Sequence, residues 1–259
     1  MSLSVDVLAV SPLPLVRLIV ALTSGRSWKV TGRAGEAEWL AGEGTSRGGE
    51  TVFSDPWAPL GVPVTYTLTG GGTWTGGPVL RTYEGQNAVT DLTGRTVADF
   101  AWHPTPGNPR TYEPRAAFVD PWGASLPVPL VGRVAGAGSG ALAARTVPPH
   151  TGTLRRLVEA NRPLLLMHSH SGGRCPIGDC DIPPVQTILL TGVTEDRRLR
   201  PDVSERVWDL TYRLVPRPHA YLAPVATWGD VKAHWAENSD LAASGLDNEA
   251  LRRGDWLVQ

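Results

Sequence analysis

The sequence is poor in lysine, in long apolar runs and in surplus charge of either sign. Lys29 and Lys232 are the only lysines among 259 residues, and the formal net charge is −1. Such a chain lacks the positive surface that nucleic acid or an anionic membrane attracts, so we expect neither partner. No stretch approaches the roughly 20 apolar residues that span a bilayer. The apolar segment 13–22 contains Pro14 and Arg17 without a basic leader or cleavage site, so we expect no signal peptide.

The sequence also lacks the common catalytic motifs. It contains no Gly-x-Ser-x-Gly, no His-Glu-x-x-His, no P-loop, and no Gly-x-Gly-x-x-Gly pattern after a strand. A hydrolase needs paired carboxylates on rigid elements. The acidic residues near the cysteines instead lie in predicted turns, where charged side chains are usually solvated. They are Asp179, Asp181, Glu195, Asp196 and Asp202. We therefore expect a protein that is not an enzyme and has no cofactor.

Turn-forming residues are abundant, with 29 glycines and 23 prolines, which favours a mainly-β protein. Residues 1–10 are expected to form either an N-terminal arm or an edge strand. A proline-rich approach at 55–61 leads into a strand that bears Tyr66, as in a fibronectin type III domain, so we predict a β-sandwich of that kind over 11–76. Its short β-like segments are 15–22, 27–31, 37–41, 51–54, 62–68 and 73–75.

Residues 77–219 are predicted to form a β-barrel with one helix. A hinge is expected at 77–90, a hairpin at 89–99 centred on Thr93 and Gly94, and a helix at 152–161 capped by Thr151 or Thr153. A loop rich in proline and glycine is expected at 103–110, followed by an extended segment at 115–130 with a turn at 120–123. The barrel core is predicted from the apolar runs 164–167 and 185–193 and from the period-two segment 207–214.

Residues 220–259 carry helix-capping residues and helical spacing instead of strand patterns, so we predict a short helical docking tail. Thr227 and Asp247 are helix-capping residues, so two short helices are expected after them. Trp228, Val231 and Trp235 share one helical stripe, and Trp256 follows. We predict that these four residues make contacts between subunits, the alternative being that the tail folds back on its own barrel.

One loop gathers the side chains that bind metal ions. His168, His170, Cys175 and Cys180 supply the ligand types of a four-coordinate zinc clamp. Their spacing matches no common zinc finger, and the same cysteines alternatively form a small-loop disulfide or remain two reduced thiols. Because of the irregular spacing, we favour the disulfide or the thiols over zinc.

Three stretches resemble the minor tail proteins, related to distal tail proteins, of siphophages and prophages of high-GC Gram-positive bacteria. They are CDIPP at 180–184, ERVWDLTYRLVPRP at 205–218 and WGD at 228–230. The resemblance covers most of the chain and implies a distal-tail-like barrel and a structural role. It implies a ring, expected to be a hexamer, that joins the tail tube to the baseplate hub. The implied partners are further copies of the chain, the tube protein, the hub protein and the tape measure protein.

This resemblance implies that the protein is located in the virion, at the tail tip, after assembly in the host cytoplasm. The alternative function is a carbohydrate-binding module for adsorption to the host cell wall. Trp28, Trp39, Trp57 and Trp74 suggest it, because flat aromatic faces stack on sugar rings. Tryptophans that are spread singly over strands are more often core residues, so we favour the structural role.

Overall fold

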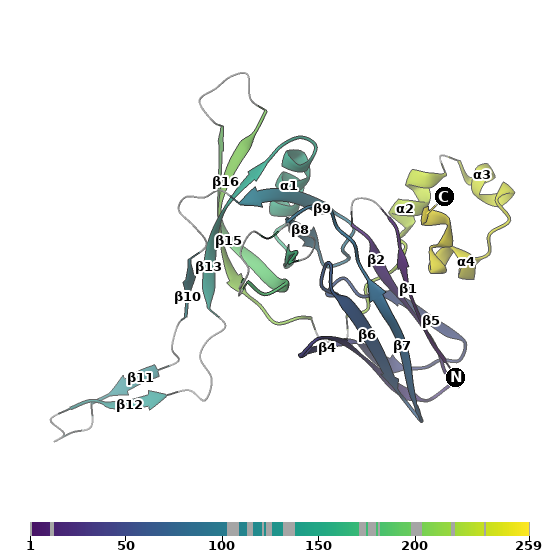
Figure 1. The fold of residues 1–259 in the computed structure, drawn as a ribbon, viewed down its shortest axis with the longest axis horizontal. Helices are drawn as coiled ribbons and strands as arrows, with labels where there is room; N and C mark the ends of the chain where they lie inside the picture. Colours follow the sequence, from purple (N-terminus) through teal and green to yellow (C-terminus); the bar gives the residue numbers. More distant parts are fainter. Residues whose placement is uncertain are drawn as a thin grey trace.

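In the computed structural model the chain forms two β modules and a short helical tail (Figure 1). The structure describes all residues except 1, 11–12, 103–108, 113–115, 121, 123–125, 132–137, 171–174, 176–179, 181, 198–203, 219–220, 236 and 259, and the side chains of Val131 and Val258. The mainly-β class expected from the sequence is confirmed.

The first module contains strands β1 (Ser2–Leu8), β2 (Leu15–Ala21), β3 (Ser27–Ala34), β4 (Ala37–Thr45), β5 (Glu50–Ser54), β6 (Pro63–Thr69) and β7 (Thr73–Leu80). These strands form two antiparallel sheets with the orders β1-β2-β5 and β4-β3-β6-β7. The two sheets contribute residues to one apolar core, so the module is a β-sandwich. Along β6, Val64, Tyr66 and Leu68 alternate inward, so the predicted buried tyrosine is found in its expected strand.

The sandwich extends further at both ends than residues 11–76. Strand β1 pairs with β2 from Ser2 to Leu8, so the N-terminal residues form an edge strand and not an arm. Strand β7 continues to Leu80, which corrects the hinge expected at 77–90. Pro78 lies within β7, and because β7 is at the edge of its sheet, the missing proline N–H disrupts no central ladder.

The second module is a closed β-barrel. Its strands are β8 (Asn87–Asp91), β9 (Val97–Trp102), β10 (Arg110–Thr111), β13 (Ser139–Thr146), β14 (Leu164–His168), β15 (Val185–Arg197) and β16 (Arg206–Leu214). The sheet order is β10-β13-β16-β15-β14-β8-β9, and β9 also pairs with β13, which closes the ring. The three core strands and the hairpin around Gly94 agree with the prediction, although β15 continues into the charged segment expected to be a turn.

Helix α1 (His150–Glu159) covers part of this barrel, and Leu154 and Leu157 belong to its core. The helix begins and ends slightly earlier than the predicted range 152–161. No side chain caps its N-terminus. The expected cap Thr151 is instead buried inside the first turn, 2.9 Å from the hydroxyl of Thr146.

The two modules share a buried apolar core. Strand β14 is buried along its whole length because its alternate residues face different partners. Leu164 and Leu166 point into the barrel, whereas Leu165 and Met167 pack against the sandwich. The shared core consists of Leu13, Trp57, Leu60, Ala88, Val97, Leu165 and Met167. The modules are therefore packed against each other directly.

Buried polar side chains reinforce this junction. The guanidinium of Arg81 is fully buried and donates to the carbonyl oxygens of Pro14 at 2.8 Å and Ala58 at 2.6 Å. Arg217, which follows the barrel, lies 3.9 Å over the ring of Trp57. It also donates to the carbonyl oxygen of Ala41 at 2.7 Å. The chain leaving the barrel is thus held against the sandwich.

A separate hairpin extends from the barrel and away from the body (Figure 1). It consists of β11 (Ala116–Val119) and β12 (Val128–Val131), which pair antiparallel. We call residues 116–130 the hairpin arm. The expected extended segment is therefore present. Its turn at 120–123 lies partly outside the described residues, as do most of the 103–110 loop and Asp179, Asp181 and Asp202.

The C-terminal tail contains α2 (Trp228–His234), α3 (Asn238–Ala243), α4 (Asn248–Arg253) and the 3-10 helix η1 (Asp255–Val258). Thr227 and Asp247 cap α2 and α4, as predicted. The tail lies beside β1 and β2 (Figure 1), where Arg17 pairs with Asp255 and donates to the carbonyl oxygen of Arg253 at 2.7 Å. The tail therefore folds back on its own chain, onto the sandwich and also onto the barrel, where Arg95 between β8 and β9 pairs with Asp230 and donates to the carbonyl oxygen of Val225, both at 2.6 Å.

Candidate metal centre and contact surfaces

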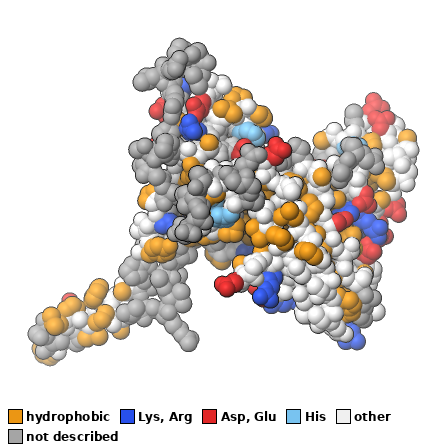
Figure 2. Space-filling model, viewed as in Figure 1, with side chains coloured by type: hydrophobic (Ala, Val, Ile, Leu, Met, Phe, Trp, Pro, Cys, Tyr) orange, Lys and Arg blue, Asp and Glu red, His pale blue; other side chains and the backbone are white. Residues whose placement is uncertain are grey.

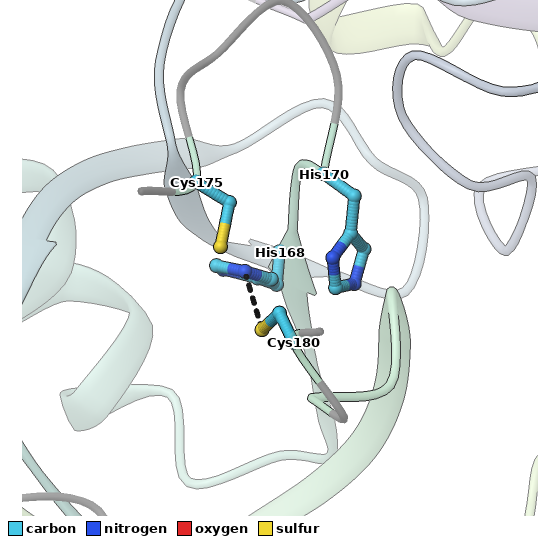
Figure 3. A group of neighbouring side chains, drawn as sticks. All are labelled: His168, His170, Cys175 and Cys180. Atoms are coloured by element: carbon cyan, nitrogen blue, oxygen red, sulfur yellow. Dashed lines mark hydrogen bonds between the residues drawn. The ribbon is translucent and has the colours of Figure 1, made fainter. Parts of the chain in front are cut away.

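The four predicted metal-binding side chains meet at one end of strand β14. His168 is the last residue of β14, and the other three follow in the loop that leads to β15. Figure 3 shows the sulfur atoms of Cys175 and Cys180 near the ring of His168, with the ring of His170 on the other side of the group. One ligand atom from each of the four residues lies within 4.8 Å of the others.

The orientation of His168 is set by two residues from other strands. The indole of Trp102 donates to Oδ1 of Asn87 at 2.6 Å, and Nδ1 of His168 lies 2.7 Å from the same oxygen. An indole nitrogen is only a donor, so the Asn87 atom must be the carbonyl oxygen and Nδ1 of His168 must carry the proton. Nε2 of His168 therefore presents its lone pair to the cluster, 3.5 Å from the sulfur of Cys180.

His170 is fixed in the complementary way. Its Nε2 lies 2.8 Å from the carbonyl oxygen of Ile182. A carbonyl oxygen only accepts, so Nε2 carries the proton and Nδ1 keeps its lone pair. The two imidazole rings meet edge to face with their centroids 4.6 Å apart. Burial and the neighbouring His170 lower the pKa of His168 to about 4, so its ring is neutral at pH 7.

Neither cysteine is in a disulfide in this structure. Asn87 and Trp102 were not identified from the sequence as parts of the site. They lie far from His168 along the chain, and only the pairing of β8 with β14 brings Asn87 opposite His168. No local motif signals that pairing.

The four predicted contact residues of the tail are placed differently from one another. Trp228 is 69% exposed, whereas Val231 is 8% exposed and Trp256 only 2%. Trp235 lies just after α2 and packs against the ring of Trp256, with their centroids 4.9 Å apart. The expected stripe of Trp228, Val231 and Trp235 is thus divided, because Val231 is buried and Trp235 lies beyond the end of α2 in extended backbone. Trp256 is corrected from a contact residue to a core residue of the tail.

The tryptophans that suggested sugar binding are mostly structural. Trp28 and Trp57 are buried, and Trp28 stacks on Phe53 in the sandwich core. Trp39 donates from its indole to the buried Asp55 at 2.8 Å. Trp74 packs against the sandwich core. These four residues form no common exposed platform.

Exposed apolar side chains gather on the hairpin arm (Figure 2). Every described side chain of β11 is exposed, on both faces of the hairpin. The large exposed residues of the arm are Phe118 at 69%, Val119 at 45%, Trp122 at 107%, Leu126 at 76%, Val128 at 47% and Leu130 at 57%. An isolated two-stranded hairpin is marginal in water, and exposed apolar surface of this kind is typical of interaction sites.

No protein-family model and no curated protein matches the chain. Among the described residues, no helix is long and apolar enough to cross a membrane.

Proposed function

We propose that this protein is a structural component of a siphophage tail tip, a distal or minor tail protein. Its copies form a ring, expected to be hexameric, between the tail tube protein above and the baseplate hub below. The tape measure protein is a further expected neighbour. The proposal is supported by the resemblance of 180–184, 205–218 and 228–230 to such proteins, and by the combination of a sandwich and a closed barrel.

The observation that carries the structural role is the exposed apolar surface of the hairpin arm. Phe118 and Leu130 project from neighbouring strands of a hairpin that has no apolar core of its own. Exposed apolar patches of this kind mark protein contacts. Placed at the end of a rigid two-module body, the arm is suited to reach a neighbouring subunit.

A second copy of the chain is the occupant that the surface chemistry favours. A groove between α1 and the β8–β9 turn is lined by Leu92, Leu157 and Tyr221, together with Arg156 and Arg162. Asp91 also lines it, but its carboxylate accepts hydrogen bonds from the Thr93 hydroxyl and the backbone N–H of Arg95. The arm carries exposed apolar side chains beside the exposed carboxylate of Asp120. Arm and groove are thus complementary in apolar character and in charge. Contacts between two different surfaces of identical subunits run head to tail, and they close into a ring when the rotation permits.

Self-association tests this proposal. We expect the purified protein to associate with increasing concentration in sedimentation velocity, and the double variant Phe118→Asp, Leu130→Asp to weaken that association at least tenfold. Val147→Asp is the matched control, because Val147 is 52% exposed on the barrel side and lies outside the arm. A wild-type protein that stays monomeric at all concentrations, or a double variant that associates like the wild type, would contradict the proposal.

The carbohydrate-binding alternative predicts a different result. A glycan-binding module binds isolated cell-wall polysaccharide as a monomer and loses that binding on a single Trp→Ala change. The same preparation is therefore tested against wall polysaccharide by calorimetry. Binding without self-association would favour the alternative.

A further inference from the structure

We propose that His168, His170, Cys175 and Cys180 bind one zinc ion in a closed, structural site. This inference goes beyond the proposed function and stands independently of it. Two imidazoles and two thiolates are a common ligand set of structural zinc, and a tetrahedral site with these ligands favours zinc over magnesium or calcium, which require oxygen ligands. The irregular spacing that argued against zinc in the sequence matters less once all four ligand atoms lie within 4.8 Å of one another.

The separation of the ligand atoms agrees with a tetrahedral centre. Zinc lies about 2.0 Å from an imidazole nitrogen and about 2.3 Å from a thiolate sulfur, so a tetrahedral angle separates the two ligand atoms by roughly 3.5 Å. Nε2 of His168 and the sulfur of Cys180 are 3.5 Å apart (Figure 3). This pair is already at the distance that a shared metal ion imposes.

Each imidazole uses one nitrogen to donate a hydrogen bond and leaves the other nitrogen, with its lone pair, free to bind the metal ion. His168 donates from Nδ1 to Asn87, and His170 donates from Nε2 to the carbonyl of Ile182. Metal-binding histidines characteristically donate their second nitrogen to an oxygen acceptor in this manner, which fixes the ring and its tautomer. Asn87 is itself held by Trp102, so the support of His168 reaches the strand pair β8–β9. Asn87 and Trp102 are therefore positioning residues.

The site closes a long loop. Met167 pairs with Val185 at the base of the β14–β15 hairpin, and all four ligands lie in or beside the loop between them. Four protein ligands leave no open coordination position, so the ion holds structure and activates no water. A metal ion held by all four ligands cross-links the loop between β14 and β15, and closing a long loop in this way gives the larger entropic stabilisation. Zinc would fasten it to the end of β14, where the barrel core and the junction with the sandwich meet.

Metal analysis of the full chain tests the proposal. The protein is purified under reducing conditions without an affinity tag, and its metal content is measured by mass spectrometry. We expect about one zinc ion per chain, falling below about one tenth of that in Cys180→Ser and in His168→Ala. His234→Gln is the control, because His234 lies in the tail beside Trp256, outside the cluster, and this variant should keep its zinc.

Two measurements on the wild-type chain keep the test decisive if a variant fails to fold. Cobalt added to the metal-free protein should produce the visible absorption of a tetrahedral site with thiolate ligands. A strong chelator should lower the melting temperature of the wild type. Absence of both effects would overturn the proposal. So would a Cys175–Cys180 disulfide in the reduced preparation, recognised by the loss of two hydrogens in the intact mass, or iron and sulfide in place of zinc.

Discussion

The indole of Trp57 donates a hydrogen bond to the hydroxyl of Thr187 over 3.0 Å, and this bond joins the sandwich to the barrel. Trp57 follows β5 of the sandwich, whereas Thr187 lies in β15 of the barrel. The same ring packs edge to face on Tyr221 and carries the guanidinium of Arg217 on its face. One side chain therefore contacts the sandwich, the barrel and the chain that leaves the barrel.

We predict that Trp57→Phe lowers the free energy of unfolding by about 1 kcal/mol, because it removes one buried hydrogen bond. Trp57→Ala should cost about 3–5 kcal/mol, because it also leaves a cavity. Urea unfolding, followed by circular dichroism, measures both effects. The wild type should unfold in one transition, since the modules share a core. Two well-separated wild-type transitions, with one of them unaffected by Trp57→Ala, would show that the junction does not couple the modules.

Asp55 provides a second test of the junction. Its carboxylate is fully buried and accepts hydrogen bonds from Trp39, Tyr66 and the backbone N–H of Trp57. We predict that Asp55→Ala lowers the free energy of unfolding by about 3–5 kcal/mol, because buried donors and the nearby Arg217 lose their acceptor.

Asp6→Ala is the control for this effect. Asp6 pairs with Arg17, but its side chain is 42% exposed. Its loss should cost less than the loss of Asp55, because Arg17 keeps Asp255 and the carbonyl oxygen of Arg253 as partners. Equal losses in the two variants, measured by urea unfolding, would argue against the special role of Asp55.

Several parts of the fold follow from local sequence patterns. The alternation in β16 predicted a strand with one buried face, the proline-rich approach at 55–61 predicted the strand with the buried Tyr66, and Thr227 and Asp247 predicted the starts of α2 and α4. The junction did not follow from such patterns. An apolar run such as Leu164–His168 indicates a strand that is buried on both faces, but it does not indicate which elements pack against either face. The hinge was wrongly predicted from glycine and proline, because an edge strand tolerates a proline that a central strand excludes.

Two tryptophans of the tail differ in burial, and alanine variants of both should therefore differ in stability. Trp256 is 2% exposed, and its indole donates to the carbonyl oxygen of Leu251 at 3.1 Å. We predict that Trp256→Ala lowers the melting temperature clearly, with a loss of about 3–5 kcal/mol, because it removes a large buried side chain. Trp228→Ala should change stability by less than about 0.5 kcal/mol, because Trp228 is 69% exposed.

Trp228 also lines a groove between α2 and α4, so it remains the tail residue best placed for a subunit contact. Sedimentation of Trp228→Ala measures that contribution. Removing residues 221–259, by contrast, should destabilise the sandwich as well as any assembly, because the tail covers β2 and β5 through Arg17 and Ser54. A truncated chain as stable as the wild type would contradict this expectation.

The proposed contact between arm and groove predicts a charge reversal experiment. Arg156→Glu with Arg162→Glu should weaken self-association at least tenfold, because the groove then repels Asp120 of the neighbouring arm. Adding Asp120→Arg to the double variant should restore most of it. Analytical ultracentrifugation at matched concentrations measures the three proteins. If the double variant associates like the wild type, or if adding Asp120→Arg does not restore the lost association, the arm contacts a different surface.

The metal site predicts an effect from a residue that touches no metal ion. Asn87→Ala should weaken zinc affinity by about 10- to 100-fold, because Nδ1 of His168 loses the oxygen that orients it. Asn87→Asp keeps that oxygen and should retain near-normal affinity. Competition with a zinc indicator measures both constants. Equal affinity in wild type and Asn87→Ala would remove Asn87 from the site.

The sequence indicated the four ligands of the metal site but not the residues that orient them. The four ligands are close along the chain and were recognised as a set, but their spacing fits no finger motif. What makes the geometry suitable is supplied from a distance, by Asn87 and Trp102 on β8 and β9. Such support arises from strand pairing across the barrel, which local spacing does not encode.

The buried junction has a mechanical consequence. Because Leu165 and Met167 of the barrel pack into a core shared with Trp57, and Arg217 lies on the face of the Trp57 ring, we expect the two modules to move as one body. If the chain is a tail-tip subunit as proposed, a force applied to one module would be transmitted to the other with little deformation between them.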